Sequence, residues 1–263
     1  MADKTNASER LTALNQGLIE TKNLAECLAI DQARLASAVL PALGLKKSAE
    51  KIIDVAEAAR RDGISRQMAQ IGAAIAESLR SERRRDAMLS AIAAHPSDTV
   101  RSWAAFVIAR APEDIPVKAR LLKMRPFAAD SHFGVREWSW IAVRPHLAAD
   151  VTQAIRELIT WTGDDDPNIR RFSVESIRPR GVWCEHIKEL KAHPEYAEEL
   201  LDRLCADPSR YVQDSVSNWI NDASKSQPEW AMRLCHRWQS GASEHTKRII
   251  SRALRTLKKK EMT

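Results

Sequence analysis

Apolar residues recur along this chain with a period of about 34 residues. Five positions align at spacings of 35, 34, 43 and 34 residues, and we call them the anchor residues: Val100, Val135, Ile169, Val212 and Thr246. Repetition at this period is typical of stacked helical pairs whose units bury each other's apolar faces. The pattern therefore predicts an array of helical repeats.

Two columns of residues follow from this alignment. The third residue after each anchor gives Trp103, Trp138, Phe172, Ser215 and Ile249, and the sixth gives Phe106, Ile141, Glu175, Asn218 and Arg252. The sixth column begins apolar and turns polar. A polar group that faces inward costs roughly 1–3 kcal/mol unless it is paired. The later repeats are therefore expected to hold buried polar groups with a partner or a function, whereas Trp138 is expected in the core.

The whole chain reads as helical. Glycine and proline are few, at eight and eleven of 263 residues, and no segment alternates in the way of a strand. We predict an all-α fold, an α-α superhelix (solenoid) of helical repeats. Residues 1–8 are expected to be disordered, and 9–260 to form a single solenoid. Within it, 9–94 are N-terminal helices and 95–260 are the repeated part, where all eight tryptophans lie.

Predicted helices in the first part lie at Leu11–Leu43 (two helices), Ser48–Ala59, Ser65–Leu79 and Arg83–Ala94. In the repeated part, each anchor helix is expected to be followed by a turn and a partner helix, such as Leu147–Thr160 or Glu185–Ala192. Proline suits the first position of a helix, and Asp before it caps the helix. Asp166-Pro167 is such a start signal.

Charge and cysteine content narrow the class of function. The net charge of +6 and the isoelectric point of about 9.2 favour an acidic partner, with nucleic acid first, although a merely soluble basic protein fits the charge equally well. The four cysteines are far apart, which indicates free thiols and neither a metal site nor a cofactor. Met1–Arg10 is polar and no stretch approaches 18 apolar residues, so we expect a soluble, cytoplasmic monomer without membrane contact.

Two polar segments carry the candidate chemistry. In Arg170–Trp183, the side chains of Arg171, Glu175 and Arg178 share a helix face, because residues three and four apart are neighbours. Arg178-Pro179 is expected to end that helix, and Trp183 to open the next helix beside the same surface. The alternative is an ion pair of Glu175 with Arg171 or Arg178 inside the seam between repeats.

In Tyr211–Lys225, the side chains of Asn218, Asn221 and Asp222 fall on one face near a helix end. The alternative is local bonding of these side chains to the backbone, which is common at helix ends. The residues nine after the last four anchors form a polar column of Arg144, Arg178, Asn221 and Arg255, which we expect to face DNA. Arginines that face one way along an array suit a phosphate backbone. Arg136 and Trp140 are further candidates for this surface.

These two segments resemble those of the DNA alkylation repair glycosylases of the AlkC and AlkD type. The stretch from Ser131 to Trp138 and the closing Ala253–Leu257 are similar to the same family, and the resemblance covers about residues 95–260. It implies HEAT-like repeats that clasp duplex DNA, and hydrolysis of the N-glycosidic bond of cationic bases such as 3-methyladenine and 7-methylguanine. These enzymes do not draw the damaged base into a pocket.

The resemblance also implies roles for individual residues. Glu175 takes the place of the family's carboxylate in the motif Arg-Arg…Glu…Arg-Pro-Arg, and Asp222 that of the Asp in the Asn-Asp pair. Trp183 matches the Trp that follows the motif. Glu175 is then expected to stabilise the cationic sugar, Asp222 to orient water, and Trp183 to contact the lesion. Arg136, Trp140, Arg144, Arg178, Asn218 and Arg255 are expected to bind DNA.

Three positions depart from the family pattern. Gln213 stands where an Arg is common, which predicts the loss of one phosphate contact, while Ser176 replaces a Gly and Gly181-Val182 replaces Leu-Pro. Two rival functions therefore stay open. One is a DNA-binding protein without catalysis, for lesions or branched DNA. The other is a protein-interaction scaffold, a common use of helical repeats.

Overall fold

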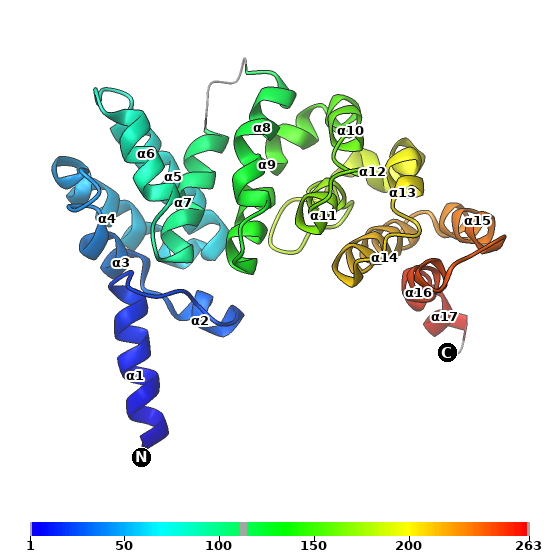
Figure 1. Ribbon diagram of the computed structural model, residues 1–263, viewed down its shortest axis with the longest axis horizontal. Helices are drawn as coiled ribbons and strands as arrows, with labels where there is room; N and C mark the ends of the chain where they lie inside the picture. The colour runs from blue at the N-terminus through cyan, green and yellow to red at the C-terminus, as the bar shows by residue number, and fades with distance from the viewer. Residues whose placement is uncertain (1, 111–114, 262–263) are drawn as a thin grey trace. The chain divides into compact units, whose positions relative to one another are not determined.

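In the computed structural model, which describes residues 2–110 and 115–261, the secondary structure is helical throughout (Figure 1). Within these residues no strand occurs, which confirms the prediction of an all-α fold. None of the helices described is both long and apolar enough to cross a membrane.

The first part of the chain contains α1 (Ala2–Asn15), α2 (Leu24–Ala29), α3 (Gln32–Val39), η1 (Lys46–Ser48), α4 (Ala49–Ala58), η2 (Ala59–Asp62), α5 (Ile64–Leu79) and α6 (Arg85–Ala93). The repeated part contains α7 (Asp98–Ala109), α8 (Val117–Ala128), α9 (Phe133–Ala149), α10 (Val151–Ile159), α11 (Pro167–Glu175), α12 (Lys188–Ala192), η3 (Pro194–Ala197), α13 (Glu198–Arg203), α14 (Arg210–Ser224), α15 (Pro228–Gln239), α16 (Glu244–Ala253) and α17 (Arg255–Glu261).

The chain divides into two compact units. Unit 1 comprises Met1–Ile115 and Leu122–Ala142, and unit 2 comprises Pro116–Leu121 and Val143–Thr263. The single solenoid over 9–260 concerns both units together and stays a prediction. Residues 2–8 belong to the helix α1, where the sequence predicted disorder. The helical conformation fits their composition, since the segment lacks both Gly and Pro.

The repeat register read from the sequence is the register of the helices. Each anchor is the third residue of its helix, in α7, α9, α11, α14 and α16 respectively, and all five side chains are buried. The third column is buried as well. In unit 1 the rings of Phe106 and Trp138 lie 6.1 Å apart, and in unit 2 those of Trp161 and Phe172 lie 5.2 Å apart. The anchors therefore mark the buried faces of the repeats, as predicted.

A repeated polar contact organises the start of these helices. The residue after each of the first four anchors donates from its side chain to backbone carbonyls of the loop before its own helix: Arg101 to His95 and Pro96, Arg136 to Asp130 and Ser131, Arg170 to Asp164 and Asp165, and Gln213 to Asp207. These bonds satisfy carbonyl groups that would otherwise be unpaired in a half-buried loop. We call this contact the loop staple.

The loop staple changes the interpretation of two predicted positions. Arg136 donates at 2.6 Å to the carbonyl of Asp130 and at 2.8 Å to that of Ser131, so this side chain holds a loop of unit 1. Gln213 is buried and makes the same kind of bond at 2.8 Å to Asp207. It therefore keeps the staple in uncharged form, and the loss of a phosphate contact at this position stays a prediction.

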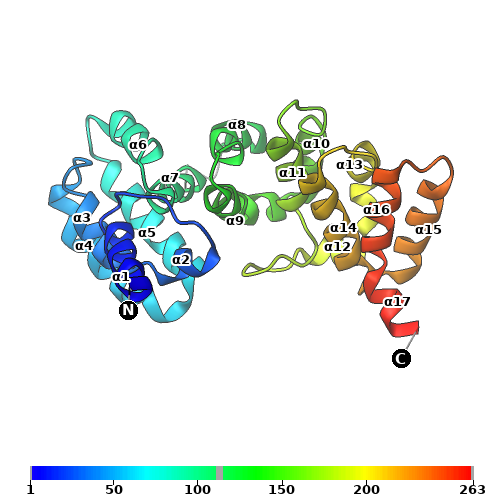
Figure 2. The same ribbon diagram turned by 60° about the horizontal axis from the view of Figure 1, so that its bottom comes forward.

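Two predicted helix boundaries also need correction. The helix α9 runs through Pro145 to Ala149, and α10 begins only at Val151, so the partner helix Leu147–Thr160 is divided. Residues 176–187 form an irregular connection between α11 and α12, and Trp183 lies in this connection rather than opening a helix. Figures 1 and 2 both show this connection extending away from α11 and α12. The start of α11 is as predicted, because Asp166 caps it by accepting from the Asn168 N–H.

Candidate nucleic-acid interface

The two predicted carboxylates lie at the C-terminal ends of neighbouring helices in unit 2. Glu175 is the last residue of α11, and Asp222 lies in the last turn of α14, which packs against α11. Arg178 joins them. Its Nη1 donates to Glu175 Oε1 at 2.8 Å, and its Nε and Nη2 donate to Asp222 Oδ2 at 3.0 and 2.6 Å. One guanidinium therefore fixes both carboxylates in place.

Glu175 is enclosed by protein. Its Oε2 accepts from the hydroxyl of Ser215 at 2.7 Å and lies 3.7 Å from Arg171 Nη2, and its side chain is 4% exposed. Burial raises the pKa of this carboxyl, but the positive charges of Arg171 and Arg178 outweigh that effect, and the net pKa lies below its ordinary value. Glu175 is therefore ionised, and both oxygens have protein partners. The ion-pair alternative is confirmed for both arginines.

Asp222 is also buried, but one of its partners lies at the surface. Its Oδ1 accepts from the ammonium of Lys225 at 3.0 Å, and the Lys225 side chain is 41% exposed. Its backbone carbonyl accepts from Arg180 Nε at 3.1 Å. Of the two carboxylates, Asp222 is therefore the one whose shell a ligand from solution can enter by displacing a single exposed cation.

Two arginines, Arg171 and Arg178, lie against the carboxylates. Arg171 Nε donates to the Ser215 hydroxyl at 3.1 Å, and its guanidinium lies 4.4 Å from the ring centre of Tyr211. A cation over an aromatic face is stabilised by the ring quadrupole. Burial lowers the pKa of Arg178, but the charges of Glu175 and Asp222 raise it more, so its pKa lies above the ordinary value. Arg178 is therefore permanently charged.

The connection 176–187 presents the predicted tryptophan to solvent. Trp183 is 47% exposed beside the exposed Val182, and its φ of 61° is the one positive value of a non-glycine residue in the part of the chain that the structure describes. A large side chain in this left-handed region is strained and persists only when its surroundings hold it. The Ile187 N–H donates to the Pro179 carbonyl at 3.1 Å, and Arg180 donates to Ser226 at 2.6 Å. The connection is therefore fixed at both ends.

Arg144 lies below this connection and not at the DNA-facing edge predicted for it. The residue is 3% exposed, and its guanidinium donates to the carbonyls of Ser176, Arg178 and Glu185. Its donors are all turned to the backbone of a neighbouring repeat, so a phosphate cannot reach them in this conformation. The prediction of Arg144 as a phosphate contact is therefore wrong for this structure.

Trp140 is a second correction, and it belongs to unit 1. The residue is buried, and its indole N–H donates to Glu137 Oε2 at 2.9 Å. A buried ring offers no face to DNA, so its assignment to the interface does not hold here. Arg136, also in unit 1, is the stapled residue described above. Neither residue is assigned to a surface with Glu175 and Asp222.

The rest of the polar column lies along α14 and the helices after it. Asn218 accepts from Arg255 Nη2 at 2.9 Å, and Asn221 accepts from the Thr256 hydroxyl at 3.0 Å. Arg255 is exposed, Asn218 is half-buried and Asn221 is buried. Arg255 and Asn218 are thus available to a ligand, whereas Asn221 joins α14 to α17.

Some residues of this site were not assigned from the sequence. The sequence marks Ser215 only as a polar residue in a column of mostly apolar ones. Its hydrogen bond to Glu175 explains why a polar residue is buried at this position. Lys225 follows Asp222 by three residues, the spacing of neighbours on a helix, so this pairing had a signal in the sequence. Ser176, which replaces a glycine of the family pattern, has a buried hydroxyl without a hydrogen-bond partner.

Positive charge dominates this part of unit 2. Five cations surround the two carboxylates: Arg171, Arg178, Arg180, Lys225 and Arg255. Within the described residues, no three His, Cys, Asp or Glu side chains gather as metal ligands. The cations of this arrangement suit the binding of a polyanion. The two carboxylates suit the stabilisation of a positively charged group on that polyanion.

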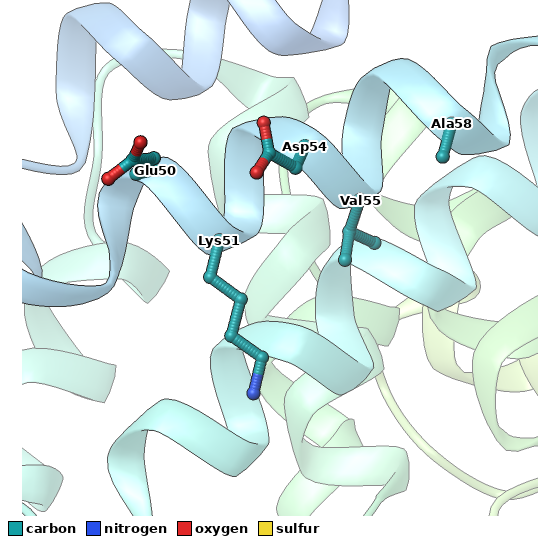
Figure 3. Close-up of a pocket in the computed structure, with 5 residues that line it drawn as sticks. All are labelled: Glu50, Lys51, Asp54, Val55 and Ala58. Atoms are coloured by element: carbon teal, nitrogen blue, oxygen red, sulfur yellow. The ribbon is translucent and has the colours of Figure 1, made fainter.

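A surface pocket of unit 1 lies apart from these residues. Its volume is about 480 Å³, and it is lined along α4 by Glu50, Lys51, Asp54, Val55 and Ala58. Figure 3 shows Lys51 pointing away from the two carboxylates of this helix. The lining comes from one helix and contains none of the predicted site residues, so the pocket does not change the assignment.

The chain is similar in sequence to part of a known protein. No protein-family model matches the chain. YhaZ of Bacillus subtilis (strain 168), itself uncharacterised, is 38% identical over 122 residues, which are 46% of this chain and 34% of YhaZ. The matched part thus spans about a third of that relative.

Solved structures give a broader match. The Pseudomonas fluorescens alkylpurine DNA glycosylase AlkC, bound to DNA containing an abasic site analog, matches with a TM-score of 0.71 and 25% identity over 90% of this chain. The match covers 65% of that AlkC chain, slightly less than two thirds.

AlkD2 from Streptococcus mutans matches with a TM-score of 0.59 and 19% identity, over 77% of this chain and 97% of AlkD2. The smu.31 protein of S. mutans UA159 matches with a TM-score of 0.55 and 18% identity, over 84% and 96% of the two chains. At these identities the two matches bear on the fold alone. Together with the match to AlkC, they confirm at the level of the fold the resemblance that the motifs indicated: the chain has the fold of the AlkC and AlkD type DNA glycosylases.

Proposed function

We propose that this protein hydrolyses the N-glycosidic bond of cationic alkylated bases, of the 3-methyladenine or 7-methylguanine type, in duplex DNA. It would thereby start base excision repair, as a cytoplasmic monomer without metal or cofactor. The observation that carries the proposal is the pair Glu175 and Asp222, fixed by Arg178 beside the connection that presents Trp183. The fold shared with DNA-bound AlkC supports DNA as the partner.

The chemistry requires little from the protein. Alkylation at a ring nitrogen makes the base positively charged and a good leaving group, so no general acid is needed. Its departure leaves an oxocarbenium-like sugar, which a nearby negative charge stabilises. A second carboxylate orients or deprotonates the attacking water.

Asp222 is the better placed of the two for water. Its outer oxygen is held by Lys225, and a DNA phosphate that attracts this ammonium would leave that oxygen free. Phosphates near Arg178 and Arg255 would also offset the positive charge around the carboxylates. The negative charge of Asp222 is then available to the sugar and to the water, as the reaction requires.

Glu175 acts at longer range. With both oxygens bonded inside the protein, it stabilises the cationic sugar through its charge and through the placing of Arg178, without direct contact. Trp183 offers its indole face to the positive base or sugar, worth ~0.5–2 kcal/mol.

The test is base release from methylated duplex DNA, followed by chromatography of the freed bases. Wild type is compared with Glu175→Gln, Asp222→Asn and a control, Arg203→Gln, which loses only an exposed ion pair with Glu199. We expect both carboxylate variants to lose on the order of 10²–10³ in rate, by analogy with other preorganised groups. Circular dichroism verifies that each variant is folded. A wild-type protein that releases no base would contradict the proposal.

One observation favours a second candidate, a DNA-binding protein without catalysis. All four carboxylate oxygens of Glu175 and Asp222 already have protein partners. A purely binding protein uses such a network to shape a cationic surface. It then binds DNA without releasing bases, and Asp222→Asn leaves or improves its affinity.

A further inference from the structure

A buried arginine binds the backbone of the connection that carries Trp183. Arg144, on α9, donates from Nη1 to the Ser176 carbonyl at 3.0 Å and from Nη2 to the Arg178 carbonyl at 2.6 Å. Its Nε and Nη2 also donate to the Glu185 carbonyl, both at 3.1 Å. One side chain thus binds both the start and the end of the connection 176–187.

These bonds satisfy carbonyls that the local backbone does not. The helix α11 ends at Glu175, so carbonyls just beyond it lack the N–H of a following turn. A buried unpaired carbonyl is costly, and a planar guanidinium reaches several at fixed angles where a lysine reaches one or two. The residue type is therefore matched to this task.

Gly181 completes the support from within the connection. A Cβ at this position would lie 2.2 Å from Cys184 Sγ and 3.4 Å from Arg144 Cζ. The backbone of the connection therefore packs directly on Cys184 and on the guanidinium. Val182 and Trp183, which follow Gly181, are exposed to solvent, and Trp183 has the strained φ described above.

We infer that Arg144 is a positioning residue, which braces the connection 176–187 and thereby holds Trp183 in the exposed conformation that contacts DNA. The inference deepens the proposed function and rests on it for the role of Trp183 at the lesion. The bracing itself is a property of the free protein. It is therefore measurable whether or not the protein releases bases.

The first readout is protection of the connection in the folded protein. Opening of the connection exposes Arg180 to cleavage by trypsin, and it speeds the reaction of a thiol reagent with Cys184, which is half-buried against Gly181. We expect Arg144→Met to raise both rates by about tenfold or more, with the buried Cys235 as an internal reference that stays unreactive. Arg144→Lys restores part of the protection, because one donor group remains.

The second readout is affinity for a duplex with an abasic site analog. Trp183→Ala and Arg144→Met should each weaken binding, and the double variant should be no weaker than Trp183→Ala alone. A merely structural role of Arg144 predicts that the two losses add.

If Arg144→Met fails to fold, Gly181→Ala tests the same layer from the opposite side and leaves the donors of Arg144 in place. Unchanged protection of Arg180 and Cys184 in the folded variants would overturn the inference, and so would additive losses of affinity. Loss of protection in a protein whose wild type releases no base contradicts the proposed function and supports the bracing.

Discussion

Arg178 binds a single oxygen of Asp222 twice, from Nε at 3.0 Å and from Nη2 at 2.6 Å, while its remaining Nη1 holds Glu175. The other oxygen of Asp222 is left to Lys225. This division separates the carboxylate into an inner oxygen with a buried partner and an outer oxygen with an exposed one. In the proposed reaction, the outer oxygen is the one that becomes free when a DNA phosphate attracts Lys225.

Removal of the bridging guanidinium should destabilise the fold. Arg178→Met deprives Glu175 and Asp222 of a buried partner, and breaking a buried ion pair typically costs ~3–5 kcal/mol. Urea denaturation measures the loss in the free energy of unfolding. Arg203→Met is the matched control, since its exposed pair with Glu199 is worth ~1 kcal/mol or less. Equal effects of the two substitutions would refute this account of the network.

Close packing in unit 1 gives a prediction about glycine. A Cβ at Gly72 would lie 2.3 Å from the Cβ of Phe106, whereas one at Gly163 would meet no atom within 4 Å. Gly72→Ala should therefore lower the free energy of unfolding by ~1–3 kcal/mol through overpacking, although Ala favours helix. Gly163→Ala serves as control and should change it little. Thermal melts of both variants decide the matter, and a stabilised Gly72→Ala would exclude direct contact of α5 with α7.

Acid stability should depend on Glu26. The hydrogen bonds from Arg10 lower the pKa of Glu26 from 4.5 to about 2, with Lys22 donating a further backbone bond. Because the folded pKa lies below the unfolded one, this stabilisation is complete above pH 4.5 and is lost as the pH falls toward 2. Solvent screening reduces it to about 1 kcal/mol.

Glu26→Gln should therefore lower the free energy of unfolding at neutral pH. It should also make the decline of that free energy between pH 4.5 and about 2 less steep. Denaturation across a pH series from 2 to 7 compares it with wild type. If the free energy of unfolding of the variant fell with pH as steeply as that of wild type, the Arg10 contact would not shift the pKa of Glu26.

DNA affinity should depend on salt through Lys225 and Arg255. Each cation that meets a phosphate contributes about 0.9 to the slope of log affinity against log salt. Lys225→Gln and Arg255→Gln should therefore each reduce the slope by up to that amount, measured by fluorescence anisotropy with a labelled duplex. Arg34→Gln, an exposed cation of unit 1, is the control with the same charge change. A slope that none of the three alters would place the DNA contact elsewhere on the chain.

The sequence was most informative where side chains repeat. The anchors fall at the third position of their helices because burial forces apolar residues to recur with the helical repeat, and the polar break at Glu175 and Ser215 marks a true buried network. The resemblance to a known family pointed to the same two segments.

Other features carry no periodic signal. Whether an arginine meets solvent or a carbonyl depends on the path of a neighbouring loop, so the sequence predicts Arg136 and Arg144 as phosphate contacts although both bind backbone carbonyls. The connection 176–187 lacks any helical period, and its course is set by Arg144, Arg180 and Gly181 together. Such contacts join residues more than 30 positions apart, beyond the reach of local patterns.

Two arginines of the loop staples also form ion pairs that have a consequence for synthesis on the ribosome. Arg101 and Arg170 each donate to an aspartate of the following repeat, Asp130 and Asp207, which lie 29 and 37 residues later in the chain. Before the later aspartate has been translated, Arg170 therefore lacks the carboxylate of Asp207, and Arg101 has only that of Glu20. The ion pairs of these two repeats are completed only when the next repeat has been translated, so a chain that stalls before Asp130 or Asp207 leaves the corresponding repeat unfinished.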